Sequence, residues 1–169
     1  LTYLSLLKMF TSLDIKHFLR SMAPVQLLGF STSSSGATLP VTMKRCEKDL
    51  GISEEISSFV LPLGATINMD GTALYQGVAA VFIAQAVGMD LTFADQFTIV
   101  ATAVLASIGT AAVPGAGIIM LVIILEAINV PSEGIALILG VDRILDMIRT
   151  ATNVTGDATV ASVMDSLER

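Results

Sequence analysis

Long stretches without charge constrain this chain more than any other feature of its sequence. No Asp, Glu, Lys or Arg occurs in residues 21–43 or 96–125, and Asp70 is the only one in residues 56–89. A helix needs roughly 20 mostly apolar residues to cross a bilayer, so each stretch is long enough to do so. The sequence therefore predicts an all-α membrane protein that lies in a lipid bilayer.

The composition excludes several functional classes. Only 14% of the 169 residues are charged and 53% are hydrophobic, whereas a soluble domain has about a quarter charged residues. The net charge of −6 leaves no basic face for a nucleic acid. One cysteine and one histidine exclude a disulfide framework, a cysteine cluster and a histidine pair for zinc. No phosphate-binding or nucleophile-elbow motif is present, so we do not expect an enzyme.

Two of the charge-poor stretches have interiors that disfavour a straight helix. Residues 31–36 read Ser-Thr-Ser-Ser-Ser-Gly, and residues 107–117 contain three glycines and a proline. Such centres break helices. Each stretch is therefore predicted to form two short helices that meet at a tip.

The flanking charges predict an orientation. Lys and Arg lie on both sides of the first stretch, whereas the third is flanked by acidic residues only. By the positive-inside rule, the first stretch starts and ends in the cytoplasm and the third starts and ends outside. Residues 1–20 would form the end of a preceding transmembrane helix and a cytoplasmic connection to the first hairpin. The rest would form a re-entrant hairpin (21–50), a broken spanning helix (53–89), a second re-entrant hairpin (92–128) and a last spanning helix (131–167).

This order of hairpin, span, hairpin and span is an inverted repeat. Secondary transporters use such repeats, and their broken helices build binding sites near the middle of the membrane. The alternative is a set of ordinary spans with kinks, which would leave an odd balance of charge on the loops.

Polar residues follow one face of the last predicted helix. Asp142, Asp146, Arg149, Asn153 and Asp157 are spaced by 4, 3, 4 and 4 residues, which places them on one side. Charged groups at membrane depth face a cavity or one another. An Arg beside an Asp suits a zwitterion, with Arg for a carboxylate and Asp for an ammonium group. The alternative is that the Asp and Arg three residues apart only satisfy each other.

The middle stretch has its own break at residues 64–72, where two glycines, an Asn and an Asp interrupt an apolar run. An unwound segment frees backbone carbonyls, which are hard oxygen ligands suited to Na⁺. The lone acid, Asp70, could instead cap the helix that follows, and capping is compatible with cation binding.

Four motifs occur in a fixed order: the Ser-rich tip before Leu39-Pro40-Val41-Thr42, Asn68-Met69-Asp70-Gly71-Thr72, Val113-Pro114-Gly115-Ala116-Gly117, and Asp146-x-x-Arg149-Thr150-x-x-Asn153-Val154-x-Gly156-Asp157. Together they closely resemble the sodium-coupled glutamate/aspartate transporter family (dicarboxylate/amino acid:cation symporters). The resemblance implies a multi-pass protein of the plasma (cell inner) membrane, a homotrimer whose protomers each combine a scaffold with a mobile transport domain. This chain resembles the C-terminal half, without the N-terminal scaffold half.

The resemblance also implies roles for individual residues. The expected contacts of an acidic amino acid are Ser34, Ser35, Thr72, Val113, Gly117, Asp146, Arg149, Thr150 and Asn153. The expected Na⁺ ligands of one site are Gly64, Asn68, Asn153 and Asp157, and those of a second are Thr66, Ser107, Ile108 and Thr110. A third site would join Asn68 and Asp70 to an earlier helix outside the chain.

Departures from the family pattern bear on coupling. Ser33 and Met147 stand where one or other group of relatives carries an Arg, which leaves the local pairing of Asp146 open. Gln76 stands where proton- and potassium-coupled relatives carry a Glu, and Ile148 replaces a small residue. We expect symport of glutamate or aspartate with Na⁺ alone, by alternating access. The alternatives are a neutral amino acid or dicarboxylate symporter of the same family, a cation channel, and a fragment that transports nothing.

Overall fold

The computed structural model describes residues 1–168, and all regular secondary structure in them is helical, which confirms the all-α class. The elements in chain order are α1 (Thr2–Phe10), α2 (Ile15–Thr32), α3 (Ser35–Lys48), α4 (Glu54–Ile67), α5 (Asp70–Ala86), α6 (Phe93–Ile108), α7 (Ala116–Ala127), the 3₁₀ helix η1 (Ser132–Leu137) and α8 (Leu139–Glu168).

The first helix pair, α2 and α3, meets at a two-residue tip. Ser33 ends α2 in the left-handed conformation (φ 53°), and the Ser34 side chain caps α3 by accepting a hydrogen bond from the backbone of Ala37. A hydroxyl at this position satisfies a backbone N–H group that has no partner within the helix. Helix α2 begins at Ile15, earlier than the expected start at residue 21, because the Asp14 side chain caps it.

The middle stretch is two helices with a break at Asn68 and Met69. The C-terminal end of α4 and the N-terminal end of α5 therefore meet at the break. Asp70 is not the cap of α5: the capping position falls to Met69, and Asp70 lies in the first turn with its side chain bound elsewhere.

The second helix pair is α6 and α7. Thr92 and Asp95 form a reciprocal capping box at the start of α6. The chain then leaves the helix at Gly109 and re-enters it after Gly115, whose φ of 77° a residue with a side chain rarely adopts. The tip between these helices is longer than the tip between α2 and α3.

The last predicted helix is divided, and the prediction of one helix from residue 131 is wrong at its start. Residues 132–137 form η1, and the α-helix begins at Leu139. Gly134 lies against Ile83 of α5 so closely that a side chain at this position would overlap it. The tighter winding of η1 thus comes with a close approach to α5 that Gly134 makes possible.

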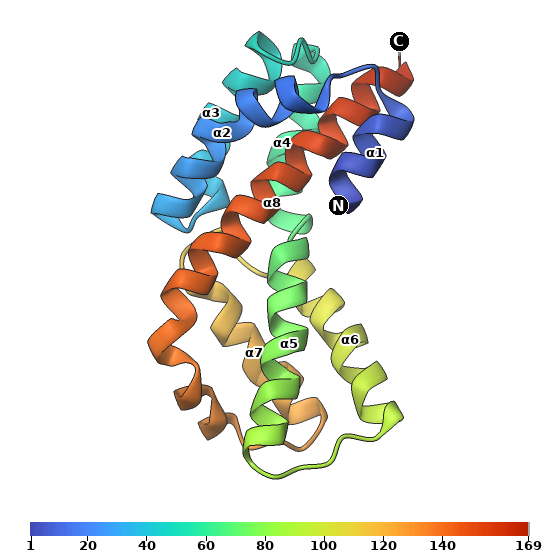
Figure 1. The fold of residues 1–169 in the computed structure, drawn as a ribbon. Helices are drawn as coiled ribbons and strands as arrows, with labels where there is room; N and C mark the ends of the chain where they lie inside the picture. Colours follow the sequence, from blue (N-terminus) through green and yellow to red (C-terminus); the bar gives the residue numbers. More distant parts are fainter. Residues whose placement is uncertain (169) are drawn as a thin grey trace.

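Helix α8 runs along the length of the molecule and joins its two ends (Figure 1). Helices α1 to α4 pack around its C-terminal half, over a core that includes Leu7, Phe18, Met22, Leu61 and Val154. Helix α5 and η1 pack against its N-terminal half, and α6 and α7 pack on α5, over a core that includes Ile83, Ile99, Leu121, Ile124 and Ile135.

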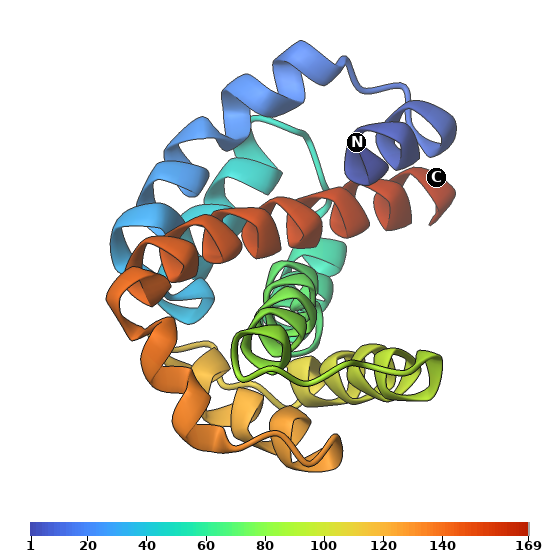
Figure 2. The same ribbon diagram turned by 60° about the horizontal axis from the view of Figure 1, so that its bottom comes forward.

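The view in Figure 2 shows the tips of both helix pairs beside the middle of α8. Among residues 1–168, none of the helices is both long enough and apolar enough to cross a membrane.

Candidate functional site

Three helix N-termini surround one small polar cavity beside α8. Ser35 lies in the first turn of α3, Thr72 in the first turn of α5 and Gly117 in the first turn of α7, and all three residues line the cavity. The N-terminus of a helix carries partial positive charge and N–H groups without partners in the helix. Three such ends around one cavity favour a negatively charged group.

The opposite wall comes from the polar face of α8. Asp146, Arg149, Thr150 and Asn153 all line the cavity and are buried, so the spacing of these residues located a face that points inward. The other expected contacts divide between the two tips. Val113 and Gly117 line the cavity from the second tip, as Ser35 does from the first. Ser34 is adjacent and joins the two tips.

The guanidinium group of Arg149 is the most constrained charge in the cavity. Its Nε atom donates to Oδ1 of Asp146 at 2.9 Å, and Nη1 donates to Oδ1 of Asp142 at 3.1 Å. The ring of Tyr75 lies 4.1 Å from the guanidinium carbon, and the Tyr75 hydroxyl donates to Asp142 at 2.7 Å. Nη2 is buried and has no hydrogen-bond partner in the described part of the chain.

The Asp146–Arg149 pair considered as an alternative is therefore present, but it does not satisfy the arginine. One N–H-bearing nitrogen stays without an acceptor in a buried place, and a buried donor without a partner costs roughly 1–3 kcal/mol. A carboxylate or carbonyl oxygen of a bound molecule would satisfy it.

Hydrogen bonds hold the two tips over the cavity. The carbonyl oxygen of Ala112 accepts from the Ser34 hydroxyl at 2.7 Å and from the backbone of Gly36 at 3.3 Å. The backbone N–H of Gly115 donates to Oδ2 of Asp146 at 2.9 Å. The tip of α6 and α7 thus contacts both the first tip and α8, and it covers the cavity.

A second group of oxygen atoms lies at the break between α4 and α5. Asn68 donates its side-chain amide to Oδ1 of Asp157 at 2.9 Å, and Gly64 faces the same carboxylate so closely that a Cβ would stand 2.7 Å from it. Asn153 lies between this group and the cavity, since its Oδ1 accepts from the backbone of Gly71 at 2.7 Å. Three of the four expected ligands, Gly64, Asn68 and Asp157, are therefore in contact, and the fourth is adjacent.

Asp70 has a partner that the sequence analysis missed. The hydroxyl of Tyr3 in α1 donates to its Oδ2 at 2.8 Å. The third expected site was to be completed by a helix outside the chain, yet a residue of the chain itself contacts Asp70. Nothing in the pattern of residues 1–10 distinguishes Tyr3 from the apolar residues around it.

The remaining expected Na⁺ ligands lie at two helix C-termini. Thr66 is in the last turn of α4 and is exposed, and Ser107 and Ile108 end α6. Thr110 follows that helix and lines the polar cavity. The side chains of Thr66, Ser107 and Thr110 all donate to carbonyls of their own segments. Helices α4 and α6 contact each other, but within residues 1–168 no hydrogen bond joins Thr66 to the end of α6.

The donor types at the break fit a small hard cation. They are carboxylate, amide and carbonyl oxygens, which suit Na⁺ better than metals that prefer thiolate or imidazole. Within the described residues no three His, Cys, Asp or Glu side chains are grouped so that they could hold a metal ion. A cation here would therefore depend on neutral oxygens as well as on the two aspartates.

Sequence reasoning assigned no substrate contact to several residues in or beside the cavity: Ser33, Met69, Tyr75, Ala111, Ala112 and Asp142. Asp142 was on the predicted polar face and could have been found by that signal. Tyr75 lies three residues after Thr72, about one helical turn away, and that spacing was a usable signal.

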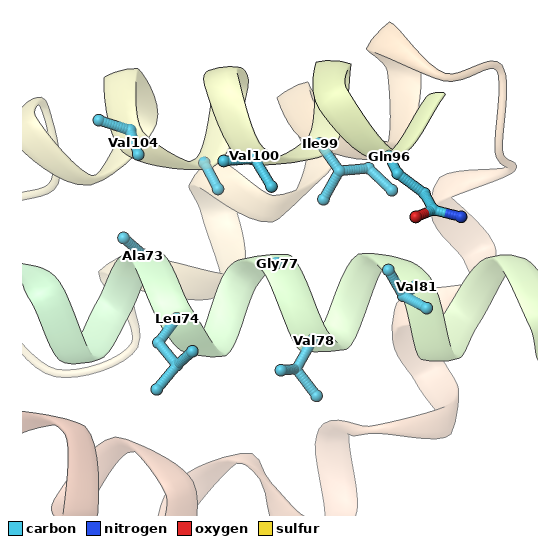
Figure 3. A pocket seen from close by; sticks show the side chains of 10 residues that line it. Ala73, Leu74, Gly77, Val78, Val81, Gln96, Ile99, Val100 and Val104 are labelled. Carbon is cyan, nitrogen blue, oxygen red and sulfur yellow. The ribbon is translucent and has the colours of Figure 1, made fainter. Parts of the chain in front are cut away.

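A larger hollow lies between α5 and α6 but has the wrong chemistry for a polar ligand. It is a groove of about 570 Å³ lined by apolar side chains such as Leu74, Val78 and Val100. The amide side chain of Gln96 also lines it (Figure 3). An apolar chain or a helix would fit this groove, whereas a zwitterion would lose its hydration there without new partners.

Sequence comparisons relate this chain to known proteins. The model of the sodium:dicarboxylate symporter family matches residues 1–167. The chain is 47% identical to excitatory amino acid transporter 1 of Rattus norvegicus over 152 residues, which cover 90% of this chain and 28% of the rat protein. It is 49% identical to excitatory amino acid transporter 3 of Mus musculus, over 90% of this chain and 29% of that protein. It is also 48% identical to an excitatory amino acid transporter of Caenorhabditis elegans, over 87% of this chain and 29% of that protein. The chain thus spans less than a third of the length of these relatives.

Proposed function

The chain belongs to the sodium:dicarboxylate symporter family, and from this membership we propose that it forms part of a secondary transporter that moves an acidic amino acid together with Na⁺. The relatives' names state that they transport excitatory amino acids. The family description supplies the coupling ion. The cavity beside α8 is the proposed binding site of the amino acid.

The observation that carries the proposal is the unpartnered Nη2 atom of buried Arg149, in a cavity lined by three helix N-termini. An acidic amino acid has two carboxylates and one ammonium group. We assign the side-chain carboxylate to Arg149, the α-carboxylate to the first turn of α3 at Ser34 and Ser35, and the ammonium group to Asp146. The remaining proposed contacts are Thr72, Val113, Gly117, Thr150 and Asn153.

Charge balance supports a coupling cation. Asp142, Asp146 and Arg149 together carry one net negative charge, and an acidic amino acid adds another. Asp157 adds one more that is buried, and Asp70 lies exposed at the break. Burying so much charge of one sign is costly unless cations enter with it. The acidic substrate and the cation then each favour binding of the other, by the same factor.

Sodium would be held by the oxygens at the break and at the ends of α4 and α6. We propose Gly64, Asn68, Asn153 and Asp157 for one site and Asp70 with Asn68 for another. Thr66, Ser107, Ile108 and Thr110 are proposed for a third site. A bound ion would supply positive charge where the C-terminal end of α4 faces the Asp157 carboxylate. Asn68 orients Asp157 toward this point, and Asn153 joins it to the substrate cavity through Gly71 and Thr72.

The second tip is the proposed gate. Its bonds across the cavity join Ala112 to Ser34 and Gly36, and Gly115 to Asp146, and the Gln76 amide donates to the carbonyl of Gly117 just beyond the tip. Breaking these few bonds would open the cavity without disturbing the core of α6 and α7. The arrangement we propose has re-entrant helix pairs at residues 21–50 and 92–128, and residues 1–20 end a preceding helix. This mobile unit would move against a scaffold from the rest of a longer, trimeric membrane protein.

Exposed apolar side chains support a lipid or protein environment for this unit. Phe59, Leu74, Phe93, Leu105 and Ile119 are each at least 70% exposed. Large apolar surfaces of this kind are covered in a mature protein by lipid or by other helices.

The test is transport by the protein that contains this chain, purified and reconstituted in lipid vesicles. We expect uptake of labelled aspartate or glutamate with an inward Na⁺ gradient and none when choline replaces Na⁺. Unlabelled acidic amino acids should compete, whereas neutral amino acids and succinate should not. Uptake that is equal in choline, or competition by neutral amino acids alone, would contradict the proposal.

A further inference from the structure

The chain has two tyrosines, and each donates its hydroxyl to an aspartate. Tyr75 donates to Asp142 beside the substrate cavity. Tyr3 donates to Asp70 at the break between α4 and α5, at 2.8 Å. The role of Tyr75 follows from its contact with Arg149, but Tyr3 lies on α1, outside the two helix pairs and the broken helix, and the proposed binding of substrate leaves it without a role.

Tyr3 reaches the break at a point where it is crowded against α8. A Cβ on Gly156 would stand 2.6 Å from the Tyr3 hydroxyl oxygen and 2.9 Å from the amide nitrogen of Asn68. The same Asn68 amide binds Asp157. The absence of a side chain at Gly156 therefore lets Tyr3 and Asn68 converge, each holding one of the two carboxylates at the break.

Asp70 needs such a partner more than Asp157 does. Asp157 is buried, with 3% of its surface exposed, and its surroundings restrict it. Asp70 is exposed, and within the described residues its side chain has a hydrogen bond only from Tyr3. Without a donor, its side chain would be free to rotate toward other staggered positions. The hydrogen bond from the Tyr3 hydroxyl holds the Asp70 side chain in one of these staggered positions.

Building on the proposed Na⁺ coupling, we propose that Tyr3 is a positioning residue of the cation site: it holds Asp70 at the break and so ties docking of α1 to cation binding. A hard cation gains most from oxygens that are already fixed where it binds, because less ordering is left to be done on binding. The carboxylate of Asp70 supplies such oxygens, and the Tyr3 hydroxyl holds it at 2.8 Å.

The test compares Tyr3→Phe with the parent in the protein that contains this chain. The readout is the rise in melting temperature with Na⁺ concentration in the absence of amino acid, with choline chloride holding the ionic strength constant. We expect Tyr3→Phe to need about three to ten times more Na⁺ for half of the rise, and to melt in choline close to the parent. A purely structural role would instead lower the melting temperature equally in both salts.

Two further variants make the result specific. Gly156→Ala places a methyl group where the Tyr3 hydroxyl and Asn68 meet, so it should weaken Na⁺ binding in the same direction. Tyr75→Phe removes the other tyrosine hydroxyl; it should weaken binding of acidic amino acid at saturating Na⁺, with the Na⁺ titration without amino acid following the parent. Parent-like or tighter Na⁺ binding by Tyr3→Phe would overturn the inference and leave the proposed function standing. A parent that shows no Na⁺-dependent stabilisation would overturn the proposed function itself.

Discussion

The Nε atom of Arg149 lies 2.9 Å from Oδ1 of Asp146, one turn earlier on the same helix, and both residues are buried. The pair orients the guanidinium group so that Nη1 meets Asp142 and Nη2 stays free in the cavity. The aspartates thus act as an internal support for the arginine, and the free nitrogen is what a ligand can bind. The predictions below begin with this relationship.

Replacing Arg149 by Cys should weaken binding of aspartate and glutamate by at least about 30-fold. A buried carboxylate that loses its charged partner costs roughly 2–5 kcal/mol. Titration calorimetry in saturating Na⁺ measures the loss. Arg149→Lys is the matched control: it keeps the charge but not the planar group that bonds to two aspartates, so an intermediate loss is expected. Parent-like aspartate affinity in the Cys variant would show that Arg149 does not bind the substrate.

Asp157→Asn should weaken apparent Na⁺ affinity by about tenfold or more, since a hydrogen-bonded charge at an ion site is worth at least 1.5–3 kcal/mol. By reciprocity, substrate affinity at limiting Na⁺ should fall as well. The measurement is substrate titration at several Na⁺ concentrations. Identical Na⁺ dependence in variant and parent would mean that the cation binds elsewhere.

Coupling should involve Na⁺ without protons or potassium. Gln76 is fully buried and donates its amide to the carbonyl of Gly117 at 3.1 Å, and an amide does not titrate near neutral pH. Uptake into vesicles should persist without internal potassium, and substrate entry should not acidify the lumen beyond a leak control. Proton entry that follows substrate entry would point to another carrier. Asp142, which is buried beside Arg149, would be the first to test, by Asp142→Asn.

Gly64→Ala should reduce both stability and Na⁺ affinity, because its Cβ would stand 2.7 Å from Oδ1 of Asp157 and force that carboxylate to move. Overpacking of this kind costs typically 1–3 kcal/mol. Gly140→Ala is the control, since a Cβ there meets nothing within 4 Å and α-helix propensity favours Ala. Melting curves with and without Na⁺ distinguish the two. Equal behaviour of the variants would contradict a close contact between Gly64 and Asp157.

Ser34→Ala should loosen the second tip, because it removes the hydroxyl that binds the carbonyl of Ala112. A net hydrogen bond is worth about 1 kcal/mol, so we expect a roughly fivefold faster opening of the cavity and weaker substrate binding. Ser31→Ala is the control, since its hydroxyl bonds only within α2, to Leu27. The modification rate of a cysteine placed at the exposed Val113 reports how often the cavity opens. Equal rates in the two variants would show that the Ser34 hydroxyl does not hold the second tip closed.

The sequence by itself determined that the fold is all-α and which residues form the polar face of the last helix. Residue spacing along one helix is fixed by the helical repeat, so Asp146, Arg149 and Asn153 had to share a side. The helix-breaking runs at residues 31–36, 64–72 and 107–117 each contain the end of a helix, because glycine, proline and small polar residues disfavour a continuous helix wherever they stand.

Only the tertiary structure decided which groups meet across helices. Tyr3 and Asp70 are 67 residues apart, as are Tyr75 and Asp142, and Ser34 and Ala112 are 78 apart. No local propensity links such positions; they meet because α8 packs against both halves of the chain and brings the two tips together. The start of α8 was mispredicted for the same reason, since the winding of η1 goes with the close contact of Gly134 and Ile83, and residue types along one segment do not specify what packs against it.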